Sequence, residues 1–286
     1  MKLNLDCIPC FQKQALQAVR FISDDEKLHQ KVLREVTKEL LESDWESTPP
    51  ELAHKVHSIV KGITNEIDPY KDVKKESKDL VFKIYPELKD MIKNSGDPLK
   101  TAIRLAIAGN IIDFGVVQEF DLEKTIREVL KKKFAIDYYE HLKETLENAE
   151  TLLFFVDNAG EICLDKLLVE TFLETKRLKK IVFVVKGGPI INDATLEDAV
   201  YMGLDLLPNS EFLAISNGEA GTGPERNSQT VKSWITEYDL VISKGQGNYE
   251  GLSEHNRLFF MLIAKCPIIA SDLGVEVGDI ILKYKQ

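Results

Sequence analysis

Acidic and amide side chains follow several apolar runs in the second half of the chain. The first run is followed by Asp157 and Asn158, a second by Asp193, and a later one by the segment from Lys244 to Glu250. If these runs are parallel strands, their carboxyl ends meet at one edge of a sheet, where open α/β proteins bind ligands. We therefore expect the functional site to lie in these segments.

The oxygen donors in these segments suit a hard divalent cation. Mg²⁺ and Mn²⁺ take carboxylate and amide oxygens together with water and substrate phosphate oxygens. Asp157, Asn158 and Asp193 supply two carboxylates and one amide. An Asp-Asn-Ala-Gly sequence is also a common turn, but turn chemistry alone does not call for acids and lysines after several successive runs.

Glycine pairs accompany two of the same segments. Gly187 and Gly188 follow one run, and Gly245 and Gly247 follow another on either side of Gln246. Backbone N–H groups of such turns can approach a phosphate, and Lys244 would add a positive charge to the same cradle. Metal ligands beside a phosphate cradle favour phosphoryl chemistry. The sequence contains no G-x-x-x-x-G-K-[ST] of a P-loop, no G-x-G-x-x-G of a dinucleotide-binding fold after the first run, and no G-x-S-x-G of a serine hydrolase.

The four cysteines leave several interpretations open. Cys7, Cys10, Cys163 and Cys266 are too few for a disulfide scaffold in 286 residues. Cys7-x-x-Cys10 is half of a four-thiolate zinc site, which the other two could complete if the fold brings them together. Buried free thiols, a soft-metal site and a redox pair are the three alternatives, with Cys7, Cys10 and Cys266 as candidates for a second site.

An apolar segment of the first half carries polar groups that need an explanation. Gly109 and Asn110 are followed by Asp113 within a run that is otherwise apolar. Buried polar groups cost free energy unless they are paired or face a cleft. The segment is either the C-terminal cap of a helix or a part of the chain that lines the substrate cleft.

The elements that must position these residues divide the chain into two halves. Residues 150–286 alternate apolar runs with helical periods, which is typical of a parallel sheet covered on both faces. The expected strands are 152–156, 181–185, 212–216, 240–243, 268–271 and 280–283, with 259–264 ambiguous, and the expected helices are 162–175, 195–202 and 224–236.

The first half shows helical signals only. Ser23 with Glu26, and Thr48 with Glu51, have the spacing of capping boxes. Further helices are expected over 70–94 with a break at Pro86, and over 97–109, 121–134 and 137–148. We therefore predict an α/β protein with an all-helical domain over 1–149, without a strand, followed by a Rossmann-like three-layer domain over 150–286. The second domain has a mostly parallel sheet and carries the metal site.

Composition and charge exclude several classes of protein. The chain is 44% hydrophobic and 29% charged, as in folded globular proteins, and its net charge is -10. This charge disfavours nucleic acid and anionic membranes as partners but allows a small phosphorylated metabolite. No stretch is long and apolar enough for a membrane span or a signal peptide, so we expect a cytoplasmic protein. The residues do not specify an oligomeric state.

Several motifs together resemble one enzyme family. Cys7-Ile-Pro-Cys10, the segment from Gly109 to Asp113, and Asp157-Asn158-Ala-Gly-Glu161 belong to the pattern, as do the segments Lys186 to Thr195, Ser243 to Glu250 and Lys265 to Pro267. They resemble the cysteine-containing, archaeal-type branch of the metal-dependent damage-control phosphatases, formerly the domain of unknown function eighty-nine. The resemblance spans nearly the whole chain.

The resemblance implies a helical domain on a Rossmann-like domain with one divalent metal ion, Mg, Mn, Co or Ni, between them. The implied activity is hydrolysis of small phosphate esters, such as sugar phosphates or damaged metabolites. The residues that the resemblance assigns are Asp157, Asn158 and Asp193 as metal ligands, Lys244 as the phosphate-binding lysine, and Asn110 and Asp113 as groups reaching in from the helical domain. Of the other motif residues, Glu161 is a catalytic candidate, and Asn248 and Glu250 are candidates for substrate binding.

The hypothesis for the mechanism is in-line attack assisted by the metal. Water or Asp157 could attack, and water is favoured because a carboxylate bound to metal is less free to act as nucleophile. Two other classes stay open, namely an S-adenosylmethionine-dependent carboxyl methyltransferase, which needs no metal, and a non-catalytic metabolite-binding or redox protein that depends on Cys7 and Cys10.

Overall fold

The computed structural model describes residues 1–109, 119–215 and 228–286. The helices of this part are α1 (Cys7–Ile22), α2 (Glu26–Glu42), α3 (Pro49–Thr64), α4 (Lys71–Lys93), α5 (Pro98–Ala108), α6 (Glu119–Lys131), α7 (Tyr139–Asn148), α8 (Ile162–Thr175), α9 (Leu196–Tyr201), α10 (Gln229–Glu237), α11 (Gln246–Leu252) and α12 (Pro267–Leu273). Its strands are β1 (Phe134–Asp137), β2 (Thr151–Phe155), β3 (Lys180–Lys186), β4 (Ser210–Ile215), β5 (Leu240–Lys244), β6 (Leu258–Ile263) and β7 (Ile280–Lys285). None of these helices is long and apolar enough to cross a bilayer.

The strands form one mixed sheet with a parallel centre. Their order is β1-β7-β6-β5-β2-β3-β4. The five strands from β6 to β4 are parallel, whereas β7 pairs antiparallel with β6 and parallel with β1. The carboxyl ends of β5, β2 and β3 therefore lie side by side, and the predicted mostly parallel sheet is confirmed.

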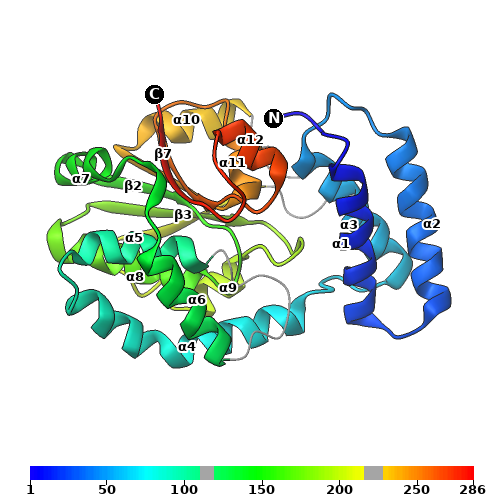
Figure 1. Ribbon diagram of the computed structural model, residues 1–286, viewed down its shortest axis with the longest axis horizontal. Helices are drawn as coiled ribbons and strands as arrows, with labels where there is room; N and C mark the ends of the chain where they lie inside the picture. Colours follow the sequence, from blue (N-terminus) through cyan, green and yellow to red (C-terminus); the bar gives the residue numbers. More distant parts are fainter. Residues whose placement is uncertain (110–118, 216–227) are drawn as a thin grey trace.

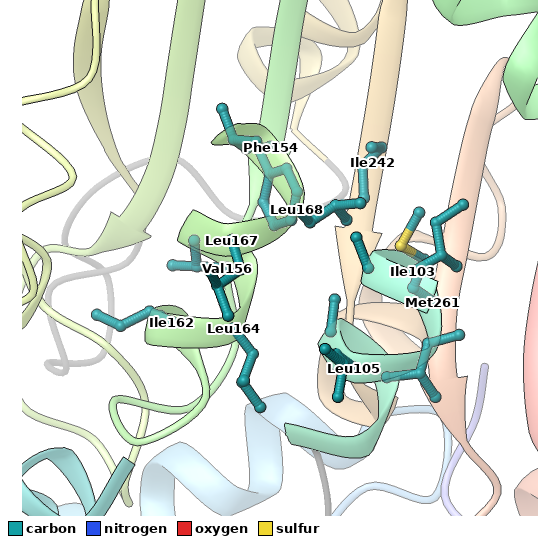
Figure 2. Close-up of a cluster of buried hydrophobic side chains, with 14 of the residues drawn as sticks. Ile103, Leu105, Phe154, Val156, Ile162, Leu164, Leu167, Leu168, Ile242 and Met261 are labelled. Carbon is teal, nitrogen blue, oxygen red and sulfur yellow. The ribbon is translucent and has the colours of Figure 1, made fainter. Parts of the chain in front are cut away.

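Helices cover both faces of this sheet. Along β2, Leu152 and Phe154 belong to one buried cluster and Leu153 and Phe155 to the other, because successive side chains of a strand point to opposite faces. Figure 1 shows α10, α11 and α12 above the sheet and α4, α5 and α8 below it. On the lower face, apolar side chains of α5 and α8 pack against β2, β5 and β6 (Figure 2). The predicted three-layer arrangement is confirmed.

The helical half of the chain is divided between two cores. Helices α1, α2 and α3 enclose a separate cluster that includes Val19, Val36, Val56 and Tyr70, and they lie to one side of the sheet (Figure 1). Buried residues of α4 to α7 belong instead to the cluster on the lower face of the sheet. The division of the core therefore falls near residue 70, and the predicted domain boundary between residues 149 and 150 does not coincide with it. We call residues 1–70 the helical lobe.

Two expectations about the strands were wrong. Residues 1–149 were expected to contain no strand, but β1 lies there and pairs with β7 at the edge of the sheet. Four residues are too few for a period to be visible in the sequence. Residues 268–271 were expected to form a strand but lie in α12, which begins at Pro267 and ends before Gly274 in the left-handed region (φ 69°). These two cap signals override the β-branched content of the run.

Helix boundaries follow local capping chemistry. The capping box of Thr48 and Glu51 is present at α3 as predicted. At α2 the expected box of Ser23 and Glu26 is wrong, since Asp25 is the N-cap and accepts from the N–H of Lys27 at 2.9 Å. Pro86 does not end its helix, because α4 continues through it to Lys93.

His57 gives the helical lobe a pH-dependent stability. Its ring is buried against Tyr70, and burial lowers its pKa to about 3 from a usual value of about 6.5. Between pH 3 and 6.5 the unfolded chain binds more protons at this residue than the folded protein does. The contribution of the neutral His57 to stability is therefore fully present above pH 6.5 and is lost as the pH falls toward 3. We expect His57→Phe to flatten this dependence in urea unfolding measured from pH 7 to 4, and equal slopes in both proteins would contradict the assignment.

Candidate functional site

A cleft of about 1160 Å³ lies between the helical lobe and the carboxyl ends of the parallel strands. The first turns of α1 and α3 form one wall. The loops after β2 and β3, together with the starts of α11 and α12, form the other wall. The cleft therefore lies where parallel sheets bind their ligands, at the carboxyl edge of the sheet.

The three predicted metal ligands meet in this cleft. Asp157 and Asn158 follow β2, and Asn158 forms an isolated antiparallel bridge with Asp193 after β3. Two backbone bonds join the same loops, from the N–H of Ala194 to the oxygen of Asp157 (2.8 Å) and from the N–H of Ala159 to that of Asn192 (2.9 Å). The fold thus places two carboxylates and one amide together, although Asp193 lies 36 residues after Asp157 in the sequence.

These donors fit a hard divalent cation by type. Asp157 and Asn158 are 9% and 5% exposed and still line the cleft, and the amide nitrogen of Asn158 lies 3.4 Å from Oδ2 of Asp157. Within the described ranges no group of three or more His, Cys, Asp or Glu side chains is arranged as a metal site. A cation held here would therefore depend on the amide oxygen of Asn158 as well as on carboxylates.

Lys186 is the lysine that the sequence analysis left without a role. It is the last residue of β3, its side chain is 6% exposed, and it lines the cleft. Its ammonium group lies 3.3 Å from Oδ2 of Asp193. The sequence did contain a signal for Lys186. It lies at a strand end beside Gly187, just as Lys244 lies at a strand end beside Gly245.

Lys244 lies beneath the cleft and is not among the described residues that line it. Its ammonium group is fully buried and contacts Oδ1 of Asp165 at 2.6 Å and Oε1 of Glu161 at 3.4 Å. Burial alone would lower the pKa of Lys244, but Asp165 and Glu161 outweigh it and raise that pKa. The resemblance assigned Lys244 and Glu161 to the reacting site, whereas the structure places them in an enclosed ion-pair network.

Asp165 completes this network and was missed by the sequence analysis. It lies in the first turn of α8, and burial raises its pKa above the usual range against the opposing effect of Lys244. The signal available in the sequence was a single carboxylate in the apolar stretch Ile162-Cys-Leu-Asp-Lys-Leu-Leu-Val169. A buried acid of this kind requires a charged partner.

The predicted phosphate cradle is only partly present. The N–H of Gly187 donates to Ile215 (3.2 Å) and that of Gly245 donates to Met261 (3.0 Å), so both are committed to the sheet. Gly187, Gly188 and Gly245 are not among the described residues that line the cleft, whereas Gly247 does line it.

The last two motif residues have different positions. Asn248 is buried, and its amide donates to the backbone oxygens of Val156 and Lys244, both at 2.9 Å, which ties the end of β2 to the end of β5. Glu250 lines the cleft and accepts from the amide of Gln246 at 3.0 Å. Asn248 therefore positions the strand ends, and Glu250 is available to the cleft.

Asn110 and Asp113 lie outside the described residues. The residue before them, Gly109, is the C-cap of α5 and packs closely on α8. A Cβ at this position would lie 2.8 Å from Cβ of Glu161 and 2.9 Å from Cδ1 of Leu164. The α5 end is thus held directly against the start of α8, which carries Glu161 and Asp165.

Three of the four cysteines share the cleft. Cys7 and Cys10 come from the helical lobe and Cys266 from the start of α12, and Gln246 donates to the sulfur of Cys266 at 3.4 Å. Burial raises the pKa of Cys7 and of Cys10, and the neighbouring thiols raise both further. Cys163 lies apart in the core, where burial raises its pKa to about 12, so it is a buried free thiol.

Charge is unevenly distributed across these contacts. The carboxylates outnumber the ammonium groups by four to two in the set Asp157, Glu161, Asp165, Asp193, Lys186 and Lys244. An excess of carboxylates and the presence of oxygen donors both suit a cation.

Gly245 is required by the close approach of Asp157. Its φ is 78°, and a Cβ at this position would overlap the Asp157 carboxylate. We expect Gly245→Ala to lower the free energy of unfolding by about 2 kcal/mol or more, through backbone strain and overpacking. Gly247→Ala is the matched control, because no atom lies within 4 Å of a Cβ there and alanine favours the helix. Equal urea midpoints for the two variants would contradict this account.

Comparison with known proteins covers the whole chain. A family model described as "Damage-control phosphatase ARMT1-like domain" matches residues 3–281. A damage-control phosphatase of Archaeoglobus fulgidus is 34% identical over 294 residues, covering 100% of both proteins. A damage-control phosphatase of Pyrococcus horikoshii is 32% identical over 286 residues, covering 98% of this chain and 97% of that protein.

A solved structure agrees with these matches. The crystal structure of a DUF89 family protein from Pyrococcus horikoshii has a TM-score of 0.87 at 29% sequence identity and covers 100% of both chains. The resemblance inferred from the motifs is thereby confirmed, together with the fold that it implied. The chain belongs to the family of proteins with a damage-control phosphatase ARMT1-like domain.

Proposed function

We propose that this protein is a divalent-metal-dependent phosphatase that hydrolyses small phosphate esters, with water as the nucleophile. The observation that carries the proposal is the group of Asp157, Asn158 and Asp193 beside Lys186 at the carboxyl edge of the sheet. Family membership supports a phosphatase role, because relatives across the full length are named damage-control phosphatases.

Each residue of the group has a separate task in this reaction. Asp157, Asn158 and Asp193 would hold the cation, which when bound supplies a Lewis acid for a phosphoryl oxygen. Lys186 supplies a positive charge for the phosphate, and Asp193 keeps its ammonium group at the cleft. Water is the nucleophile in this proposal, because a carboxylate that binds the metal is less free to attack.

We assign phosphate binding to Lys186 in place of Lys244. A group that neutralises charge on the transferred phosphoryl must reach the substrate. Lys186 lines the cleft, whereas the ammonium group of Lys244 is fully buried and engaged by two carboxylates. The geometry therefore favours Lys186 for substrate and Lys244 for support.

The cleft is large enough for a phosphorylated metabolite. Pockets for small molecules have volumes of roughly 300–1,000 Å³, and this cleft is of about 1160 Å³. Sugar phosphates or damaged phosphometabolites are the substrates that we propose. The cation that we propose is Mg, Mn, Co or Ni, because oxygen donors accept all four. We also propose a cytoplasmic location for the enzyme.

Metal dependence is tested with protein stripped of metal by a chelator. We expect p-nitrophenyl phosphate and sugar phosphates to be hydrolysed only after a divalent metal is added back. Asp157→Ala should lower kcat by at least about 100-fold, since it removes a ligand. Asp205→Ala, an exposed acid outside the cleft, is the control and should keep full activity. Activity that survives the chelator, or methyl transfer from S-adenosylmethionine, would contradict the proposal.

The two lysines are separated by a pair of substitutions. Lys186→Met should raise KM about 10- to 100-fold, the effect of losing a charge-assisted hydrogen bond to phosphate. It should destabilise the fold less than Lys244→Met, because its partner Asp193 lines the cleft and is 17% exposed. Lys244→Met should instead destabilise the fold by about 3–5 kcal/mol, because Asp165 and Glu161 are left buried without their cation. Kinetics and urea unfolding measure both effects, and the reverse pattern would return phosphate binding to Lys244.

A further inference from the structure

The loop after β3 contains an isoleucine in a backbone conformation that suits glycine. The N–H of Asp193 donates to the backbone oxygen of Ile190 (3.0 Å), which closes a four-residue turn over residues 190–193. Ile191 is the second residue of this turn and has a φ of 47°. Turns with a positive φ at that position usually have glycine, asparagine or aspartate there, and a β-branched residue with such a φ is strained. The reason for an isoleucine must therefore lie outside the turn itself.

The side chain of Ile191 supplies that reason. It is partly buried and packs against the apolar core of the helical lobe, which α1, α2 and α3 enclose. A second contact joins the same two parts of the protein, because the ammonium group of Lys61, in the last turn of α3, donates to the backbone oxygen of Pro189. Strained residues persist where the surrounding structure holds them. The lobe thus holds this loop at two points.

The other side of the turn is joined to the loop after β2. The backbone oxygen of Asn192 accepts from the N–H of Ala159 at 2.9 Å. Asp193, the last residue of the turn, forms the isolated bridge with Asn158. The turn therefore extends from the core of the helical lobe to the group of proposed metal ligands, and it lines the cleft between them.

We propose that Ile191 is a positioning residue through which the helical lobe holds Asp193 in place for a divalent cation. The Ile191 side chain fixes the turn against the lobe, and the turn carries the carboxylate on its last residue. Contacts that orient a metal ligand raise the affinity for the metal, because the ligand is already in place when the ion arrives. The inference rests on the proposed function, since it assumes that Asp193 is a metal ligand.

Glycine at position 191 separates the effect of the side chain from that of the backbone. Glycine adopts a positive φ without strain, so Ile191→Gly allows the turn to form but removes its apolar contact with the lobe. If the turn alone positioned Asp193, this variant would bind a cation as tightly as the wild type or more tightly. If the contact with the lobe positions Asp193, the variant binds more weakly.

The test is a calorimetric titration of Mn²⁺ into the metal-free full-length protein, with urea unfolding measured in parallel. We expect Ile191→Gly to weaken Mn²⁺ binding about 10-fold or more, the usual scale for loss of a group that orients a metal ligand. Ile191→Val loses a single methylene and should stay within about threefold of the wild type. Leu28→Ala is the matched control, because Leu28 packs against the same lobe core from α2, none of whose described residues lines the cleft. It should lower the unfolding midpoint without changing Mn²⁺ affinity.

The outcomes separate this inference from the proposed function. Weaker binding in Ile191→Gly, with affinity retained in Ile191→Val and Leu28→Ala, supports the inference. Unchanged or tighter binding in Ile191→Gly would overturn it, and so would an equal loss in Leu28→Ala, since affinity would then follow the stability of the lobe in general. Binding of Mn²⁺ by the wild type leaves the proposed function standing in both cases. A wild type that binds no Mn²⁺ would overturn the inference and the proposed function together.

Discussion

The parallel pairing of β2 between β3 and β5 is the constraint on which the site depends. Because all three strands run in the same direction, the loops that follow them emerge at one edge and are forced into contact. Hydrogen bonds between the loops after β2 and β3 then bring Asp157, Asn158 and Asp193 together. The third strand end approaches Asp157 so closely that only glycine fits at position 245. Any change of register would separate these groups.

Buried charge is the second organising feature, and it occurs in two places with different consequences. Under the cleft, carboxylates exceed ammonium groups, which leaves a deficit that a cation can fill. Between α4 and α9, Asp198 is held by Lys74 and Lys78, and these contacts lower its pKa despite its burial. The latter group balances its own charge once Asp68, which pairs with Lys74 at 2.8 Å, is counted, and it ties two helices together. The two buried groups therefore differ in their balance of charge.

The helical lobe gives the cleft its second wall. Its core is separate from those on the two faces of the sheet, and it contributes Cys7 and Cys10 opposite the strand ends. Cys266 lines the same cleft, and desolvation keeps the pKa of Cys7 and Cys10 high. Raised thiol pKa values reduce the fraction of reactive thiolate at neutral pH. This environment favours thiols that shape the cleft wall over a redox pair.

Local patterns in the sequence were sufficient for much of the fold. Apolar runs with turn residues at their ends located β2, β3 and β5, and the capping box at Thr48 located α3. The same patterns named Asp157, Asn158 and Asp193, because ligand-type residues after parallel strands converge. Elements without a local signal were missed, such as β1, whose four residues are stabilised by pairing with β7.

The roles of individual residues depended on tertiary contacts. Lys186 and Lys244 occupy equivalent places in the sequence, each before a glycine at a strand end, yet one lines the cleft and the other is enclosed by Asp165 and Glu161. The burial of each lysine and the distance to its partners arise from the packing of α8 against the sheet. The hydrophobic periodicity of the sequence does not predict this packing. The sequence thus determined the strands and the ligand-type residues at their ends, whereas long-range packing decided which charged groups line the cleft, because solvation and charge pairing exist only in the folded protein.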